Sequence, residues 1–302
     1  MTALHFLACD WGTTHLRAWV LDRDGNVQVR RKFPFGVSTI GPGEAEKMFQ
    51  DQVRPAMDAE DLPALLCGMI GSTLGWTVVP YLTCPATLSD IAAGIIRVSR
   101  APPAWIVPGL LAEGIDKAPD VMRGEETQIV GWIVTEGSSV HAEHLICHPG
   151  THSKWVVVAG GSIVRFVTAM TGELFELLRK HSVLRGAPTP YDDTSFDEGV
   201  LAAGNGNALA ARLFTTRART VTGSGVRSPE SYLSGVLIGA EVASTPSALG
   251  FTQANVTLIG DRKLCHLYER VLSRVGDKPR FVDGEDAALA GLTALANRVP
   301  IQ

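Results

Sequence analysis

The chain has 302 residues, which is enough for two domains of ordinary size. Hydrophobic residues make up 45% of it and charged residues 19%, a composition typical of a globular protein with ample core material. The formal net charge of −4 gives no electrostatic indication of binding to nucleic acid or to an anionic membrane surface.

The longest apolar runs, such as Trp155 to Gly161, are too short to span a bilayer. No basic-then-apolar leader opens the chain, so we expect no secretion signal. The cysteines are odd in number, and most stand in apolar, strand-like contexts: Cys9, Cys67, Cys84, Cys147 and Cys265. This usage favours reduced thiols over a disulfide framework and predicts a cytoplasmic protein.

The first turn of the chain carries a dense set of polar groups. The apolar run Leu4–Cys9 leads into Asp10-Trp11-Gly12-Thr13-Thr14, and a second strand-like stretch follows at Leu16–Leu21. Backbone N–H groups, two hydroxyls and one carboxylate within five residues suit phosphate oxygens and a hydrated divalent cation. We therefore expect Asp10 to hold Mg2+ through water, and Gly12, Thr13 and Thr14 to bind phosphate. A polar turn that only ends a strand is the alternative.

Strands and helices alternate through the rest of the first half. The expected strands are Val27–Val29, Ala64–Ile70 and Ala104–Gly109, and the expected helices are Gly43–Met57, Leu88–Val98 and Glu125–Thr135. This order indicates a ribonuclease-H-like layer, in which a mixed sheet ends in strands that alternate with helices.

The second half repeats this order of elements, without a repeat in the sequence itself. The expected strands are Glu143–His148, Lys154–Ala159, Ser162–Thr168 and Val256–Gly260, and the expected helices are Gly172–Ser182, Asp197–Phe214, Tyr232–Ala243, Arg262–Val275 and Gly284–Ala296. Gly, Ser and charge cluster near Gly137–His141. We therefore predict an α/β fold of two ribonuclease-H-like domains, residues 1–138 and 139–302.

A second polar turn, Pro149-Gly150-Thr151-His152-Ser153-Lys154, joins two strands at the head of the second half. Two such turns in equivalent places predict a nucleotide whose phosphates lie between the two domains. Gly150, Thr151 and Ser153 would bind the phosphates, and Lys154 would add a cation. The alternative is a hairpin turn with an exposed lysine.

The stretch Arg123-Gly124-Glu125-Glu126-Thr127-Gln128 opens the helix that ends the first half. Acidic residues at a helix N-terminus can be simple caps. A kinase that acts on an alcohol also needs a carboxylate to orient the hydroxyl and accept its proton. We predict Glu125 as this catalytic base and leave Glu126 open. Arg123 is the first candidate for binding an acidic substrate, and Arg17 is the second.

The glycine-rich stretch Gly68–Trp76 combines flexible backbone with hydroxyls and an indole. We expect Ser72 and Trp76 to line a pocket for a polar small molecule, although a loop around a packed tryptophan has the same pattern. A zinc site is disfavoured, because His144 and Cys147 would point to opposite faces of a strand. The chain has neither a P-loop motif nor a Rossmann glycine motif after its first strand.

Together these motifs resemble those of the 2-dehydro-3-deoxygalactonokinase family, within the superfamily of sugar kinases, actin and Hsp70 ATPases. The resemblance covers most of the chain. It rests on Asp10–Thr14, Gly68–Ser72 with Trp76, Pro80-Tyr81, Cys84-Pro85-Ala86, Val107-Pro108-Gly109, Val121–Gln128, Pro149–Trp155 and Thr171–Phe175.

The resemblance implies two actin-like ATPase domains with a cleft between them. It implies transfer of the γ-phosphoryl of ATP, with Mg2+, to the 6-hydroxyl of 2-dehydro-3-deoxy-D-galactonate in galactonate catabolism. Gly260 and Asp261 would hold adenosine, and the last helix, residues 284–297, would cross back to the hinge. The broader sugar kinases carry an Asp where this chain has Glu125, and they have a double glycine where it has only Gly260.

Two alternatives stay open. One is a kinase of another sugar or sugar acid, such as 2-dehydro-3-deoxygluconate, because a fold does not determine its substrate. The other is an actin- or Hsp70-like ATPase switch that binds protein, which the compact length disfavours. The expected partners are ATP and a small sugar acid, with neither nucleic acid nor membrane. The oligomeric state stays open, a homodimer included.

Overall fold

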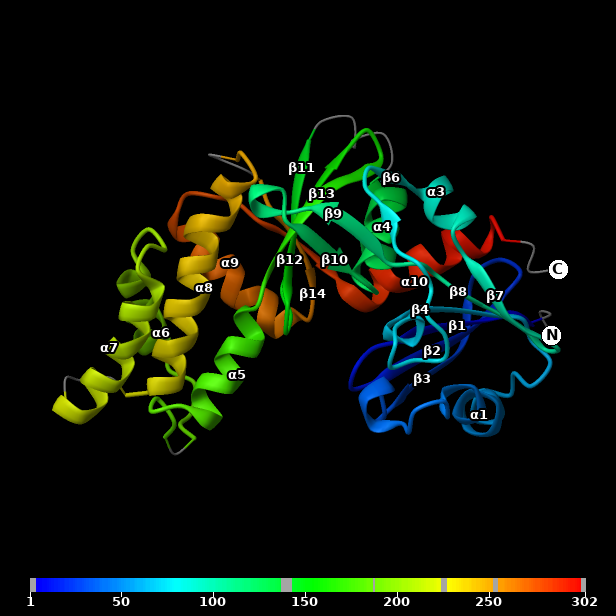
Figure 1. The fold of residues 1–302 in the computed structure, drawn as a ribbon, viewed down its shortest axis with the longest axis horizontal. Coiled ribbons are helices and arrows are strands. Elements are labelled where there is room, and N and C mark those ends of the chain that lie inside the picture. Colours follow the sequence, from blue (N-terminus) through cyan, green and yellow to red (C-terminus); the bar gives the residue numbers. More distant parts are fainter. Residues whose placement is uncertain (1–3, 137–142, 187, 224–226, 252–254, 300–302) are drawn as a thin grey trace.

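Two six-stranded sheets form the framework of the protein (Figure 1). The computed structural model describes residues 4–136, 143–186, 188–223, 227–251 and 255–299. The first sheet, in the order β3-β2-β1-β4-β8-β7, contains β1 (Leu4–Trp11), β2 (Leu16–Asp22), β3 (Val27–Phe33), β4 (Ala64–Gly68), β7 (Ile96–Arg100) and β8 (Pro103–Ile106). The second, in the order β15-β14-β11-β12-β13-β6, contains β6 (Ala86–Thr87), β11 (His144–His148), β12 (Ser153–Ala159), β13 (Ser162–Ala169), β14 (Thr257–Gly260) and β15 (Arg280–Asp283).

The two sheets share one internal plan. In the first, β1, β2 and β3 pair antiparallel in succession, and β4 and β8 continue parallel from β1. In the second, β11, β12 and β13 pair antiparallel, and β14 and β15 continue parallel from β11. This repeated order confirms the predicted α/β fold of two ribonuclease-H-like units.

Part of the first half joins the second sheet. Strand β6 pairs antiparallel with β13, at the edge of that sheet. The short strands β5 (Leu82–Thr83), β9 (Leu110–Glu113) and β10 (Pro119–Met122) form a separate three-stranded sheet. The segment near Gly137–His141, where we expect the domain boundary, lies outside the described residues, so the boundary stays a prediction.

The expected helix Leu88–Val98 is wrong in its second half. A capping box between Thr87 and Asp90 starts α3 (Leu88–Ala93), which ends at Gly94. Strand β7 begins at Ile96, and both Ile96 and Val98 pack against the core of the first sheet. The helix expected at Gly43–Met57 is present as α1 (Ala45–Met48), a π-helical stretch (Phe49–Val53) and α2 (Arg54–Ala56).

The helix expected at Asp197–Phe214 is also wrong, because two helices replace it. α6 (Asp193–Ala203) ends before Gly204 and Gly206, which both have positive φ, and α7 (Leu209–Thr222) follows. The remaining helices match their predicted positions: α4 (Glu125–Glu136), α5 (Thr171–His181), α8 (Pro229–Ala248), α9 (Arg262–Arg274) and α10 (Gly284–Ala296). None of the helices in the described ranges is long and apolar enough to cross a membrane.

Helices α4 and α10 cross between the two sheets (Figure 1). Their backbones touch, since a Cβ at Gly131 would overlap the carbonyl oxygen of Ala287 and one at Gly291 would overlap that of Thr127. One cluster of buried side chains runs from the first sheet to the second and includes Leu292 of α10. The two halves therefore share a hydrophobic core.

Candidate active site

The first polar turn lies between β1 and β2 and exposes its hydroxyls. The N–H of Gly12 donates to the carbonyl of His15 at 2.9 Å, which closes the turn. The N–H of Ser38 donates to the carbonyl of Thr13 at 3.1 Å, so a neighbouring segment supports it. Thr13 and Thr14 are both exposed, and their side chains are accessible to a ligand.

Asp10 lies near the end of β1, beside the guanidinium of Arg17 and the thiol of Cys67. Nη1 of Arg17 donates to its Oδ2 at 3.3 Å, and Sγ of Cys67 lies 3.9 Å from Oδ1. Burial raises the pKa of Asp10, and the Arg17 guanidinium opposes that shift. Nε of Arg17 also lies 3.1 Å from a carboxylate oxygen of Glu285, at the start of α10. Arg17 is therefore shared between two protein carboxylates.

Two glycines bring the start of α4 against this turn. A Cβ at Gly68 would lie 2.7 Å from the carbonyl oxygen of Trp11, and one at Gly124 would lie 3.2 Å from Cα of Gly68. The negative charge of Glu125 contributes to the raised pKa of Asp10. The two carboxylates therefore belong to the same site.

The two glutamates of α4 have different surroundings. Glu126 is fully buried; it accepts the N–H of Gly124 at 2.6 Å and the hydroxyl of Thr127 at 3.0 Å. Burial, with the nearby charge of Glu125, raises the pKa of Glu126 to about 8. Glu125 is half-buried and accepts the N–H of Arg123 at 3.2 Å. Glu125 is therefore the more accessible carboxylate.

Arg123 is a buried cation with unused donors. Its Nη2 donates to the carbonyl of Val79 at 2.7 Å, and the guanidinium lies over the ring of Tyr81 at 4.3 Å. Within the described residues, Nε and Nη1 have no hydrogen-bond partner. A Cβ at Gly71 would lie only 2.9 Å from Nη1, which places the guanidinium beside the Ser72 loop.

Ser72 and Trp76 take part in the structure of their own loop. The hydroxyl of Ser72 donates to the carbonyl of Met69 at 2.7 Å. The indole N–H of Trp76 donates to a carboxylate oxygen of Glu46 at 3.2 Å, and its ring lies 5.7 Å from that of Phe49. Both side chains stay partly exposed, so contact with a substrate remains open to them.

The second polar turn joins β11 to β12 and rests on α5. The N–H of Glu173 donates to the carbonyl of Thr151 at 2.9 Å, and the side chain of Thr151 is exposed. The hydroxyl of Ser153 is buried, 2.8 Å from the Tyr268 hydroxyl. The Lys154 ammonium donates to the carbonyl of Val121 and the hydroxyl of Thr168, both at 2.8 Å. The side chains of Ser153 and Lys154 thus point into the protein.

Gly260 ends β14, Asp261 follows it, and both lie near the second turn. A Cβ at Gly260 would lie 3.6 Å from the carbonyl oxygen of Pro149, and one at Gly284 would lie 2.9 Å from Cα of Gly260. Asp261 caps α9, because its Oδ1 accepts the N–H groups of Lys263 and Leu264 at 3.0 Å. The second turn and the starts of α9 and α10 therefore converge.

His148 is a site residue to which the sequence analysis gave no role. Its Nε2 lies 2.8 Å from Oε1 of Gln128, so a hydrogen bond links the end of β11 to α4. Burial lowers the pKa of His148, and the charge of Glu125 opposes that shift. The signal available in the sequence was a histidine directly before the second polar turn. In the described ranges, no three His, Cys, Asp or Glu side chains gather as a metal site.

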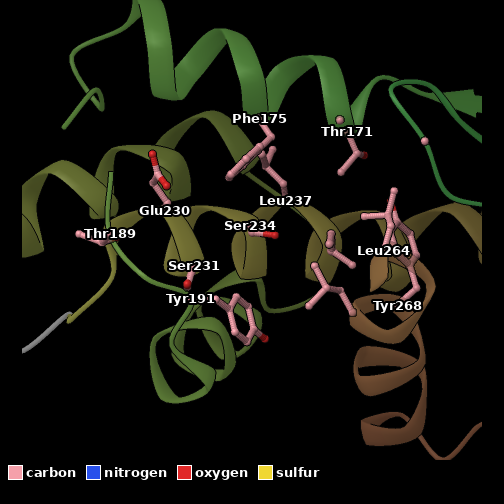
Figure 2. Close-up of a pocket in the computed structure, with 14 residues that line it drawn as sticks. Thr171, Phe175, Thr189, Tyr191, Glu230, Ser231, Ser234, Leu237, Leu264 and Tyr268 are labelled. Carbon is pink, nitrogen blue, oxygen red and sulfur yellow. The ribbon is translucent and has the colours of Figure 1, made fainter. Parts of the chain in front are cut away.

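A cavity of about 260 Å³ opens beside the second turn and includes Gly150 in its lining. Figure 2 shows the side chains around it, which come from α5, α8 and α9: Thr171, Phe175, Ser234, Leu237, Leu264 and Tyr268. Sequence reasoning missed this cavity, because its walls are helices distant in the chain with no shared motif.

The model of the 2-keto-3-deoxy-galactonokinase family matches residues 10–295. The chain belongs to this family. A family relative from Escherichia coli (strain K12), named 2-dehydro-3-deoxygalactonokinase, is 36% identical over 302 residues and covers 99% of each chain. A second, from Rhizobium meliloti (strain 1021) and named "Probable 2-dehydro-3-deoxygalactonokinase", is 35% identical over 309 residues, with 99% of this chain and 98% of its own covered.

The fold is shared with the family along nearly the whole chain. The crystal structure of a Sinorhizobium meliloti protein described as a 2-dehydro-3-deoxygalactonokinase superposes with a TM-score of 0.85 at 33% identity. The superposition covers 97% of this chain and 98% of that one. These matches confirm the predicted family and fold class, whereas the roles of single residues stay predictions.

Proposed function

We propose that this protein is an ATP-dependent kinase that phosphorylates the 6-hydroxyl of 2-dehydro-3-deoxy-D-galactonate in galactonate catabolism. The observation that carries this function is the family match over residues 10–295. Phosphoryl transfer depends mainly on positioning and on neutralising charge. Two polar turns, with Thr13 and Thr14 exposed in the first and Thr151 exposed in the second, would supply the required phosphate contacts.

ATP is placed with its adenosine in the cavity between α5, α8 and α9 and its phosphates between the two turns. The cavity is lined by Gly150 of the second turn, so one ligand would reach both. Gly260 and Asp261 lie at the adjoining start of α9. Thr13 and Thr14 of the first turn would approach the phosphates from the other side.

The carboxylates of the site fit a hydrated Mg2+ ion. Mg2+ prefers oxygen ligands and keeps several of its waters, and Asp10 is a carboxylate with Glu125 nearby. Asp10 would therefore hold the ion through water. When bound, the ion supplies positive charge to the phosphates, while Arg17 balances Asp10 in its absence.

The sugar acid is placed beside the start of α4. Glu125 would accept the proton of the attacking hydroxyl, since the two oxygens of Glu126 already bond within the helix start. Arg123 would bind the carboxylate of the sugar acid, because it has unused buried donors whereas Arg17 already contacts two carboxylates. Ser72 and Trp76 would line the same pocket.

We infer a cytoplasmic location from the cysteines. All five are unpaired, and four of them are buried. Burial raises the pKa of the Cys84 thiol to about 11, so this half-buried cysteine is also unreactive.

The test is a substrate panel that compares ATP turnover without sugar, with 2-dehydro-3-deoxygalactonate and with its C4 epimer, the gluconate derivative. We expect turnover to depend on the sugar acid and kcat/KM to be higher for the galactonate derivative. An ATP turnover rate that is the same with and without each sugar acid would support the ATPase switch. A higher kcat/KM for the gluconate derivative would support the other kinase.

A further inference from the structure

Glu241 is a buried carboxylate that the proposed reaction does not use. It lies on α8 with 5% of its surface exposed, and it has no cationic partner among the described residues. The indole N–H of Trp155 donates to Oε1 at 2.7 Å, and the hydroxyl of Tyr268 donates to Oε2 at 2.8 Å. Burial raises the pKa of Glu241, and hydrogen bonds from Thr171, Ser153 and these two side chains oppose the shift.

The hydrogen bonds of Glu241 reach the second polar turn. The Tyr268 hydroxyl also lies 2.8 Å from the hydroxyl of Ser153, the residue at which the turn enters β12. Thr171 begins α5, the helix whose Glu173 N–H holds the carbonyl of Thr151. The Glu241 carboxylate is therefore connected to the turn in two places, through Tyr268 to Ser153 and through Thr171 to the start of α5.

The same hydrogen-bonded side chains form a wall of the cavity. Thr171 and Tyr268 line it (Figure 2). Gly150 of the turn lines it as well. Thr171 and Tyr268, two of the four residues that hydrogen-bond to Glu241, thus face the space where we place adenosine. The other two, Ser153 and Trp155, are buried residues of β12, the strand into which the turn leads.

We propose that Glu241 is a positioning residue for ATP: it sets the second phosphate turn relative to the adenosine cavity. The inference rests on the proposed nucleotide site. An ionised carboxylate only accepts hydrogen bonds, and an indole N–H only donates, so this acceptor matches the donors around it. A glutamine would place an amide N–H against one of those donors. The hydrogen bonds that fix the turn relative to the cavity wall would then be lost.

The cleanest test is Tyr268→Phe, because it removes one hydroxyl and keeps the ring. We expect KM for ATP and Kd for ADP to rise roughly tenfold, the effect of losing one hydrogen bond to a charged group. KM for the sugar acid should not change, since the turn and cavity do not contact it. Tyr232→Phe is the matched control. That tyrosine is also buried, and its hydroxyl lies 2.9 Å from that of Thr215, outside the cavity.

A second variant, Ser153→Ala, tests the connection to the turn. Its effect on Kd for ADP should not add to that of Tyr268→Phe, because both break one chain of hydrogen bonds. Glu241→Gln should weaken ADP binding more than either. If Glu241→Gln does not fold, the two milder variants still decide the matter.

Calorimetric titration with ADP separates the ways in which the inference can fail. If Tyr268→Phe binds ADP as tightly as Tyr232→Phe does, the positioning role is overturned and the proposed function stands. Equal losses for ADP and the sugar acid would also overturn it, because they indicate a general structural role. Wild-type protein that binds no ADP would overturn the nucleotide site and the inference with it.

Discussion

Glu125 and Glu126 are neighbours in sequence but differ in burial and in hydrogen bonding. Positioned general bases contribute roughly 10²–10⁴-fold to a rate. We therefore expect Glu125→Gln to lower kcat by about that range, with KM for the sugar acid little changed. Steady-state kinetics measure both. Glu126→Gln is the matched control and should keep most of the turnover. The opposite pattern would assign the base to Glu126.

Glu126 should also make stability depend on pH. Its folded-state pKa of about 8 is raised above its ordinary value of 4.5, so between these values the folded protein binds more protons than the unfolded chain. Stability then falls as pH rises through this window. We expect the free energy of unfolding to decrease from pH 5 to pH 8.5. In Glu126→Gln this decrease should be smaller, as urea titrations at several pH values would show. An equal slope in both proteins would contradict it.

Asp10 is expected to act through Mg2+. Asp10→Asn removes the charge that holds the hydrated ion, so turnover at ordinary Mg2+ concentrations should drop sharply while the circular dichroism spectrum is unchanged. Asp24→Asn, at an exposed position of the β2–β3 turn, serves as the control. Near-wild-type kcat for Asp10→Asn would contradict the role of Asp10 in holding Mg2+.

At the scale of elements, local patterns were enough for much of the fold. The apolar runs of β1, β2, β12 and β13 predicted those strands, and turn chemistry predicted both polar turns. Strands β5 and β6 are two residues long, so they have no periodicity to recognise. They are strands only because β5 pairs with β9 and β6 pairs with β13 in the folded protein.

Parts of the site depended on packing that no local pattern contains. Ser153 and Lys154 end the second polar turn and begin β12, and the alternation along β12 sends their side chains to opposite faces. One face is covered by α9 and the other by the β10 segment, both remote in sequence. The cavity and the role of Glu241 likewise depend on how α5, α8 and α9 come together.

The close crossing of α4 and α10 requires glycine, which has no side chain, at the two contact positions Gly131 and Gly291. We expect Gly291→Ala to destabilise the protein by about 2 kcal/mol or more, because its Cβ would overlap the carbonyl oxygen of Thr127. Gly186→Ala is the control, since a Cβ there meets nothing within 4 Å. Urea denaturation of the two variants makes the comparison. Equal free energies of unfolding for the two variants would show that α4 and α10 can move apart without loss of stability.

For the whole molecule, we expect the two polar turns, which belong to separate sheets, to close around the ligands. Sugar acid together with a non-hydrolysable ATP analogue should reduce the radius of gyration measured by solution scattering. Either ligand alone should produce a smaller change, because only both together reach all parts of the site. An unchanged radius would exclude a closing motion, though not kinase activity.

The pairing of β6 with β13 has a consequence for how the chain folds during its synthesis. Ala86, Leu110 and Met122 belong to the first half, yet they are buried in a cluster that includes Ile163 and Phe166 of β13. A nascent chain that ends before β13 cannot cover these side chains. Domains usually fold as units in the order in which they are made. Here the first half must keep an apolar surface open until β13 has left the ribosome.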